Sequence, residues 1–312
     1  MANTVISVAN SVLNEMKNYY SASLQPKTPQ GGVFLAKVNG CTVTAYKSGK
    51  VMFQGANGEV EAAKWVKSSN IPKQTPKGKQ VHSSNKAPSS TISSLAVIGS
   101  DEVGTGDYFG PMTVVASFVE PSQFELLKEL GVKDSKALND DQICEIAKNI
   151  LHVVPYSLLI LHNEKYNEMQ AKGYNLNKLK AVLHNKAIAN LIQKLNGKHY
   201  DAILIDQFTP PSSYYGYLKG TKVVIREKVE FATKAEGLHL SVAVSSILAR
   251  YAFLQQMDQL SEKAGMTLPK GAGAKVDQVA AKFMKTKGIE TLKGFAKLHF
   301  ANTDKAKNIA GI

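Results

Sequence analysis

The sequence is poor in cysteine and contains no long hydrophobic run. Cys41 and Cys144 are its only two cysteines, so neither a disulfide framework nor a thiolate metal site is expected. No stretch approaches the ~20 apolar residues that a membrane span needs, and the N-terminus lacks the charged start and apolar core of a secretory signal. These absences favour a soluble, cytoplasmic protein without a membrane partner.

Arginine and acidic residues are scarce in the first part of the chain. Residues 1–90 contain 11 Lys, no Arg and 3 Glu, so +8 of the total net charge of +13 lies there. Basic surface attracts polyanions because it releases condensed counterions when it meets phosphates. A lysine ammonium group is a point charge that does not select one binding geometry, unlike the planar arginine side chain. This charge therefore indicates non-specific phosphate binding, unless it serves solubility alone.

A linker divides the chain into two parts. Residues 71–94 are rich in Pro, Ser and Lys and show no apolar period, which is typical of a linker. Residues 1–70 before it are predicted to form a small α+β domain, because helical spacing alternates with short apolar runs that turn residues separate. The predicted elements are a helix at 4–20, strands at 33–38, 41–46 and 51–54, and a helix at 59–68.

Residues 95–312 have the pattern of an α/β domain, in which strands alternate with longer helices. A short turn joins the first two strands, so they must pair antiparallel, and a mixed sheet flanked by helices is predicted. The run 201–206 is nearly continuously apolar, as in strands buried in the middle of a sheet. The predicted elements are strands at 95–100, 113–119, 201–206 and 222–227, and helices at 139–150, 177–195 and 240–260.

Carboxylates lie at the ends of two predicted strands. Asp101 and Glu102 come just before a Gly-x-Gly turn, and Asp206 ends the second buried strand. A buried carboxylate is costly unless it is paired or binds a cation, and the functional crevices of α/β sheets lie at strand ends. Taken singly, an Asp-Glu pair before glycines is more typical of an acidic turn, and Glu236 of a helix-start charge. In combination they indicate a cation site.

Four segments of this second part resemble the type 2 and type 3 ribonucleases H. They occur in that family's order and span most of residues 95–250. The segments are residues 100–111, 132–138, 203–206 and 246–250. The resemblance implies an RNase H-like mixed sheet flanked by helices as the catalytic domain.

Three features resemble ribonuclease HIII, the type 3 branch, rather than ribonuclease HII. Thr105 lies between the glycines where type 2 enzymes usually carry an arginine, and the fourth acid is Glu236 instead of the aspartate usual in type 2. The N-terminal extension, with residues 46–55, is similar to the type 3 extension, whose fold is similar to half of a TATA-box-binding protein. Residues 297–303 also resemble the type 3 C-terminus.

The resemblance implies a metal site formed by Asp101, Glu102, Asp206 and Glu236. Two Mg²⁺ or Mn²⁺ ions are expected, and oxygen ligands without a His or Cys cluster agree with these metals. Such ions activate a water and stabilise the leaving 3′-oxygen, which gives 5′-phosphate and 3′-hydroxyl ends. Asp101 is expected to bridge both ions at the end of the central strand. A turn at Val103 and Gly104 is expected to let Glu102 share the site.

The substrate implied by the resemblance is the RNA strand of an RNA/DNA hybrid, and no obligate protein partner is evident. The backbone of Gly104, Thr105 and Gly106 is expected to contact sugar 2′-hydroxyls, the groups that distinguish RNA from DNA. The absence of an arginine from this loop argues against strong activity at a single ribonucleotide embedded in DNA.

Further substrate contacts are expected outside the glycine loop. Ser135 and Lys136 are candidates for phosphate contacts, although a short helix-start turn also explains them. Lys133 belongs to the same segment and is a further candidate. Tyr108 either stacks on a sugar or base or is a core aromatic.

Two alternative functions remain open at this point. A non-catalytic nucleic-acid-binding protein would fit the lysine-rich N-terminal part, but the presence of all four acids argues against it. A DNA-directed nuclease of the same broad fold would carry a similar site and would cleave an all-DNA duplex.

Overall fold

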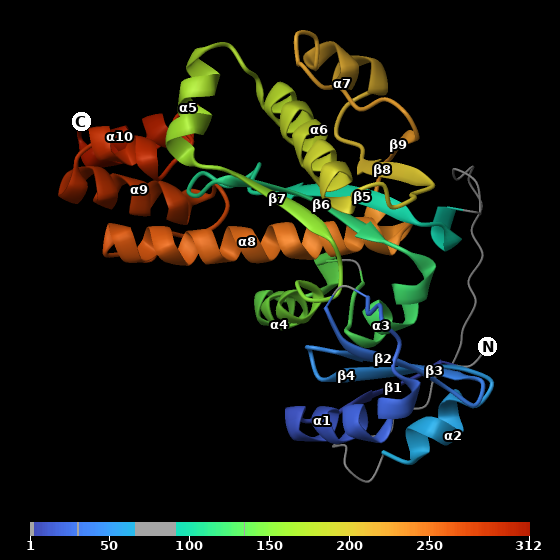
Figure 1. Cartoon of the computed structure of the whole chain (residues 1–312). Coiled ribbons are helices and arrows are strands. Elements are labelled where there is room, and N and C mark those ends of the chain that lie inside the picture. The colour runs from blue at the N-terminus through green and yellow to red at the C-terminus, as the bar shows by residue number, and fades with distance from the viewer. Residues whose placement is uncertain (1–2, 30, 66–91, 134) are drawn as a thin grey trace, which may run out of the picture.

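The structure is a computed structural model that describes residues 3–29, 31–65, 92–133 and 135–312. It contains a four-stranded sheet near the N-terminus and a five-stranded sheet farther along the chain (Figure 1). The predicted linker lies outside the described residues except for its end, where Ile92–Ser94 form a short 3-10 helix.

The first sheet is antiparallel, with the strand order β1-β4-β3-β2. Helices α1 and α2 pack against one of its faces, where Leu13, Met16, Val43 and Phe53 belong to one buried cluster (Figure 1). The three strands predicted from the short apolar runs are therefore present. The elements are β1 (Asn3–Ser7), α1 (Asn10–Tyr19), β2 (Gly32–Val38), β3 (Cys41–Tyr46), β4 (Lys50–Gly55) and α2 (Gly58–Ala63).

The single helix predicted over residues 4–20 is wrong in its first part. β1 pairs with β4, so that Thr4 lies opposite Phe53 and Ile6 lies opposite Val51. The β-branched run Thr4-Val5-Ile6 favours a strand, and the helical spacing begins only with α1. The apolar period alone could not separate these two elements.

The second sheet is mixed, as predicted, and has the order β7-β6-β5-β8-β9. Its central strand β5 pairs antiparallel with β6 and parallel with β8, and every residue of β6 is buried. The strands are β5 (Val97–Val103), β6 (Met112–Val119), β7 (Tyr156–Leu161), β8 (Ala202–Asp206) and β9 (Val229–Ala232).

The strand predicted at 222–227 is wrong, because the last strand of the sheet is β9. The backbone of the predicted segment bonds instead to a side chain of helix α6. Asn185 Nδ2 donates to the carbonyl of Val223, and Asn185 Oδ1 accepts from the N–H of Ile225. These bonds satisfy backbone groups that a strand would pair with a neighbouring strand.

Helices α6 and α8 lie on opposite faces of the second sheet (Figure 1). Asn139 caps α4, and its side chain accepts from the N–H of Gln142. Within the described residues no helix is both long enough and apolar enough to cross a membrane. The helices are α3 (Phe124–Glu129), α4 (Asp140–Ile150), α5 (Asn163–Ala171), α6 (Leu176–Leu195), α7 (Pro211–Tyr217), α8 (Leu240–Ala264), α9 (Ala274–Lys287) and α10 (Asn302–Ala310).

The two sheets are joined by packing around α3 and α4. Tyr46 and Met52 of the first sheet belong to the same buried cluster as Leu126 of α3 and Ile146 of α4. Figure 1 shows these two helices between the first sheet and α8. The lysine-rich N-terminal part therefore packs against residues 95–312 through apolar side chains.

Small residues bring α8 close to the central strand. Ser245 Oγ donates to the carbonyl of Gly99 at 2.9 Å, and Ser117 Oγ donates to the carbonyl of Ser241 at 2.8 Å. A Cβ atom on Gly99 would lie 2.4 Å from the backbone of Ser241 and Val242. The absence of a side chain at this position allows the N-terminal half of α8 to reach the strand that carries Asp101.

Gly99→Ala is expected to destabilise the protein by about 2–4 kcal/mol, because the new methyl group forces α8 away from β5. Urea unfolding measures this difference. Gly216→Ala in α7 is the matched control, since a Cβ there would meet no atom within 4 Å and alanine favours the helix. A Gly99 variant as stable as the Gly216 variant would contradict the close packing.

Candidate active site

The acids lie where the pairing between β5 and β8 ends. The parallel pairing of these strands stops at Ser100 and Ile205, so Asp101 and Asp206 directly follow the last paired residues. Glu236 lies in the short 3-10 turn Ala235–Gly237 that precedes α8. The side chains of Asp101 and Glu236 are buried, with relative exposures of 8% and 9%.

Asp101 lies on the α8 face of the sheet. It accepts a hydrogen bond from the N–H of Glu102 at 2.7 Å. The hydroxyl of Ser246 on α8 favours the charged form and partly lowers the pKa of Asp101. Burial, followed by the charges of Glu102 and Asp206, raises the pKa of Asp101 to about 8. Negative charge is thus crowded into a poorly solvated place, which is the electrostatic setting that a bound cation relieves.

Backbone and hydroxyl donors hold Asp206 and Glu236 in place. The N–H of Ala235 donates to Asp206 Oδ1 at 2.9 Å. Ser135 Oγ lies 3.4 Å from Glu236 Oε2 and 2.8 Å from the hydroxyl of Ser246. Ser135 therefore lies beside the acids, and its predicted phosphate contact stays a prediction. The side chain of Lys136 lies outside the described part of the structure.

Glu102 points to the opposite face of the sheet. β5 stays extended through Val103, which pairs with Thr113, so the turn expected to align Glu102 with Asp101 does not occur there. The carboxylate instead contacts α6, where Lys180 Nζ bonds to Oε1 and His184 Nε2 lies 2.8 Å from Oε2. Burial opposes ionisation of Glu102, but His184 and Lys180 outweigh it and lower the pKa of Glu102.

Lys180 and His184 were missed in the sequence. Both are buried, and the ring of Phe208 lies beneath them: its centroid is 4.1 Å from Lys180 Nζ and 5.3 Å from the His184 ring centroid. His184 Nδ1 also lies 2.7 Å from the hydroxyl of Ser100. The sequence feature that could have indicated them is the presence of two polar residues, four positions apart, on the apolar face of the predicted helix 177–195.

The two glycines of the loop differ in their surroundings. Gly104 has a φ of +93°, and a Cβ there would lie 2.2 Å from the carbonyl oxygen of Pro111, so the fold itself requires glycine. Gly106 is exposed and has no neighbour within 4 Å of a Cβ position, which leaves its backbone open to a ligand. Thr105 between them is half-buried.

The other substrate candidates differ in accessibility. Tyr108 is fully buried, and its hydroxyl lies 3.0 Å from that of Thr303, so the core interpretation holds and its ring does not face solvent. Lys133 is exposed and precedes the segment that carries Ser135.

The C-terminal segment is hydrogen-bonded to the glycine loop and the residues that follow it. Lys297 is fully buried, and its ammonium group donates to the carbonyls of Asp107 at 2.8 Å and Gly110 at 2.5 Å. The N–H of Gly110 donates in turn to the carbonyl of Phe295. Burial lowers the pKa of Lys297 to about 7, an effect that the charge of Asp107 partly opposes.

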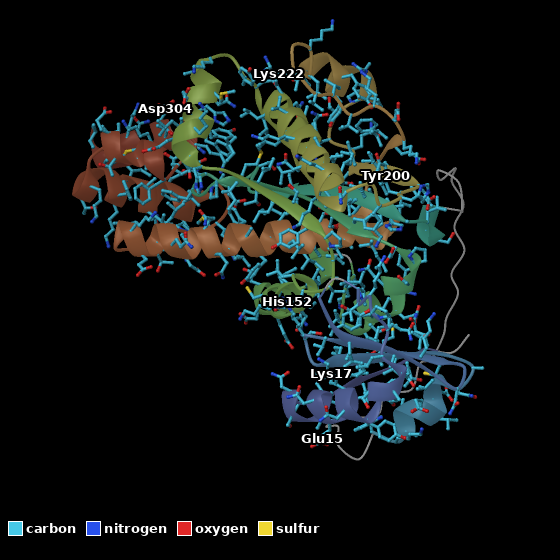
Figure 2. The ribbon with its side chains drawn as sticks, in the orientation of Figure 1. Glu15, Lys17, His152, Tyr200, Lys222 and Asp304 are labelled. Carbon is cyan, nitrogen blue, oxygen red and sulfur yellow. The ribbon has the colours of Figure 1, made fainter. Side chains whose placement is uncertain are left out.

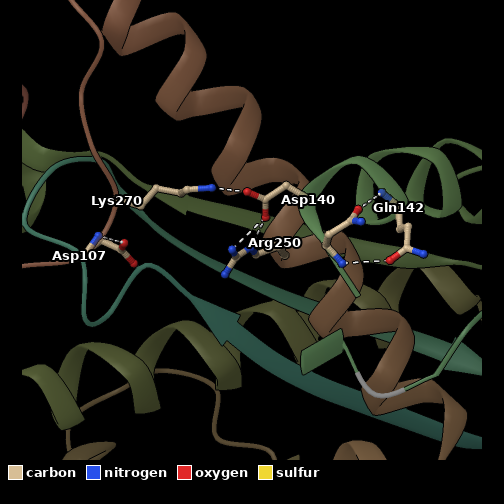
Figure 3. A network of polar contacts seen from close by, with 7 residues as sticks. Asp107, Asp140, Gln142, Arg250 and Lys270 are labelled. Carbon is tan, nitrogen blue, oxygen red and sulfur yellow. Dashed lines mark hydrogen bonds and ion pairs between the residues drawn. The ribbon is translucent and has the colours of Figure 1, made fainter. Parts of the chain in front are cut away.

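A polar network extends from this loop to the start of α4 (Figure 3). Asp140 accepts from Arg250 at 2.8 Å and is also bonded to Lys270. The next residue, Gly271, donates its N–H to Asp107 Oδ1 at 2.6 Å. The network connects the glycine loop, α8 and the helix that follows Ser135, so these parts of the site are held together.

The donors fit a hard divalent cation in their chemistry, since they are carboxylate oxygens. In the described residues, however, no three Asp, Glu, His or Cys side chains converge on one point as they stand. Glu102 is turned toward Lys180, and Glu236 lies near Ser135. Binding of a cation by three or more of these acids thus requires a side-chain rearrangement.

The sequence matches known proteins over most of its length. Residues 98–303 match the family described as Ribonuclease HII. A relative from Bacillus mycoides named Ribonuclease HIII is 61% identical over 302 residues, which cover 97% of this chain and 96% of that protein. The chain belongs to this ribonuclease H family. A second Ribonuclease HIII, from Bacillus cereus, is 60% identical and covers 98% of both chains.

Solved structures of ribonucleases H share the fold. Bst-RNase HIII in complex with Mn²⁺ matches with a TM-score of 0.71 at 43% identity over 99% of both chains. Aquifex aeolicus RNase H3 has the same fold at 23% identity, with a TM-score of 0.52 and coverage of 95% and 99%. Residues 3–78 match a family described as Domain of unknown function (DUF3378). The resemblance to ribonuclease HIII is confirmed, and the chain is an endoribonuclease of the ribonuclease H class.

Gly104→Ala is expected to destabilise this ribonuclease by about 2 kcal/mol or more, because the left-handed backbone and the Pro111 carbonyl both exclude a Cβ. Gly106→Ala should change the stability by less than about 0.5 kcal/mol. Thermal denaturation of the two variants compares them directly. Equal losses of stability would show that the loop does not have the conformation described.

Lys297→Met is expected to alter the dependence of stability on pH. The pKa of Lys297 falls from 10.5 to about 7 on folding, so between these values the unfolded chain binds a proton that the folded chain does not. Its contribution to stability therefore rises with pH, by about 1.4 kcal/mol per unit across this window, and is least favourable below about pH 7.

Urea unfolding of both proteins between about pH 7 and pH 9 measures this effect. The stability of the wild type relative to Lys297→Met should increase as the pH rises. The exposed Lys293→Met is the control and should show no such trend. A pH-independent difference for Lys297→Met would refute the lowered pKa of Lys297.

Proposed function

We propose that this chain hydrolyses the RNA strand of RNA/DNA hybrids, using two divalent metal ions held by Asp101, Glu102, Asp206 and Glu236. The observation that carries the proposal is the position of Asp101 and Asp206 directly after the last paired residues of two parallel strands. The names of its relatives and the Mn²⁺ complex of Bst-RNase HIII support the same reaction and the same class of metal.

The chain's own groups orient the acids for this reaction. Bound Mg²⁺ or Mn²⁺ would supply the Lewis acidity that activates a water and stabilises the leaving 3′-oxygen, so the products carry 5′-phosphate and 3′-hydroxyl ends. The N–H of Ala235 orients Asp206, and the N–H of Glu102 donates to Asp101. A bound cation would favour the ionised form of Asp101, whose pKa is raised by burial and by the charges of Glu102 and Asp206.

Substrate recognition is assigned to the exposed groups around the acids. The backbone of Gly104, Thr105 and Gly106 lies just beyond β5 and would contact 2′-hydroxyl groups of the RNA strand, with Gly106 the most accessible. Ser135 lies beside Glu236 and would contact a phosphate near the cleaved bond, together with Lys136. Lys133 would add positive charge at the edge of the site.

The N-terminal part is proposed to bind the hybrid. We assign residues 1–70 to a substrate-binding domain, 71–94 to a linker and 95–312 to the catalytic domain. Helices cover one face of the first sheet, whereas Lys37, Thr42 and Gln54 line a surface hollow. A net charge of +8 over residues 1–90 suits attraction to the phosphates of a duplex without selecting its sequence.

Asp101→Asn is expected to reduce cleavage of a full hybrid about a thousandfold or more, because one formal negative charge is lost from the metal site. Hybrid binding should persist, as measured by fluorescence anisotropy. Asp201→Asn at the opposite end of β8 is the charge-matched control, since its side chain accepts from the N–H of Ala96 and lies away from the acids.

The cleavage assay uses a full hybrid, a duplex with a single ribonucleotide and an all-DNA duplex, each with Mg²⁺ and with Mn²⁺. Cleavage of the full hybrid alone or at the highest rate supports the proposal. Retention of activity by Asp101→Asn would refute the metal assignment, and equal cleavage of the all-DNA duplex would favour a DNA-directed nuclease.

A further inference from the structure

Lys180 is a buried cation that faces the acids from α6 (Leu176–Leu195). Its side chain is 10% exposed and that of Glu102 is 11% exposed, and the two are bonded as an ion pair. Removal of an ammonium group from water is costly, so its position needs both a counter-charge and a favourable contact. Glu102 provides the first, and the ring of Phe208 at 4.1 Å provides the second.

The two oxygens of Glu102 are both engaged in these contacts. Lys180 bonds to Oε1, and His184, one helical turn further along α6, bonds to Oε2. A cation that binds the Glu102 carboxylate therefore competes with both contacts for its negative charge. Lys180 is the competitor that carries a fixed charge of the same sign as the incoming ion.

Lys180 is also connected to the second strand of the site. The Phe208 ring beneath its ammonium group belongs to the segment that directly follows Asp206, two positions further along the chain. The same ring stacks on His184. The Phe208 ring thus connects Lys180, which is paired with Glu102 on β5, to the segment that follows the acidic end of β8.

We propose that Lys180 is a positioning residue that serves as a tethered counter-ion of the acid cluster. In the ion-free enzyme it orients Glu102 and offsets part of the repulsion among the carboxylates, and it competes with divalent ions for this charge. The inference rests on the proposed function, because it takes the acids to be the metal site. It adds that the affinity for the metal is limited by a residue of the chain itself.

The test is an isothermal titration calorimetry experiment, in which Mn²⁺ is added to the substrate-free full-length protein. Lys180→Met should bind Mn²⁺ roughly five- to tenfold more tightly than the wild type, because one competing positive charge is removed. Its melting temperature without metal should fall, and the increase in melting temperature caused by Mn²⁺ should be larger than in the wild type. Lys180→Arg keeps the charge and should restore an affinity close to that of the wild type.

Lys186→Met is the matched control, since it removes one exposed charge from the same helix without touching Glu102. Unchanged or weaker binding by Lys180→Met, relative to this control, would overturn the inference. If Lys180→Met does not fold, Lys180→Gln in the same titration decides the question with the same expected direction. A purely structural role for Lys180 predicts weaker binding, not tighter binding.

The same titration of Asp101→Asn distinguishes failure of the role assigned to Lys180 from failure of the proposed metal site. Loss of Mn²⁺ binding in Asp101→Asn together with unchanged affinity in Lys180→Met would overturn only the role of Lys180. Wild-type binding that Asp101→Asn does not weaken would instead refute the metal site, and with it the proposed function.

Discussion

Repulsion among carboxylates at the ends of two neighbouring strands is the constraint on which the rest of the site depends. Asp101 is buried, and the charges of Glu102 and Asp206 add to its burial in raising its pKa. Such a cluster destabilises the fold unless donors or cations oppose it. The backbone N–H of Ala235, the hydroxyl of Ser246 and the ammonium of Lys180 are placed against it, and each comes from a different part of the chain.

The close packing of α8 against the central strand makes this arrangement possible. Gly99 leaves room for the helix backbone, and Ser245 fills the contact with a hydroxyl that bonds to the strand carbonyl. The hydroxyl of the following residue, Ser246, lies 2.8 Å from that of Ser135 and partly lowers the pKa of Asp101. On the opposite face α6 brings Lys180 to Glu102. Adjacent residues of a strand point to opposite faces of the sheet. Asp101 therefore faces α8, whereas Glu102 contacts α6.

The glycine loop next to the acids is held by contacts from the C-terminal segment. The buried side chain of Lys297 donates hydrogen bonds to two carbonyls of this loop, those of Asp107 and Gly110. Asp107 in the same loop accepts from the segment that follows α8. The N-terminal sheet, in contrast, meets the larger part through apolar residues such as Tyr46 and Met52. A loop held in place beside the acids and a separate lysine-rich surface would both suit a polyanionic substrate.

The sequence by itself determined the mixed sheet and the presence of carboxylates on its core strands. These features follow from local periodicity and from the cost of burying charge. Only the tertiary structure decided that Glu102 faces Lys180 instead of lying beside Asp101, and that the last strand is β9 rather than residues 222–227. Periodicity shows which positions are buried, but it does not show which polar side chains of distant segments meet, because the packing of the helices on the two faces of the sheet sets those contacts.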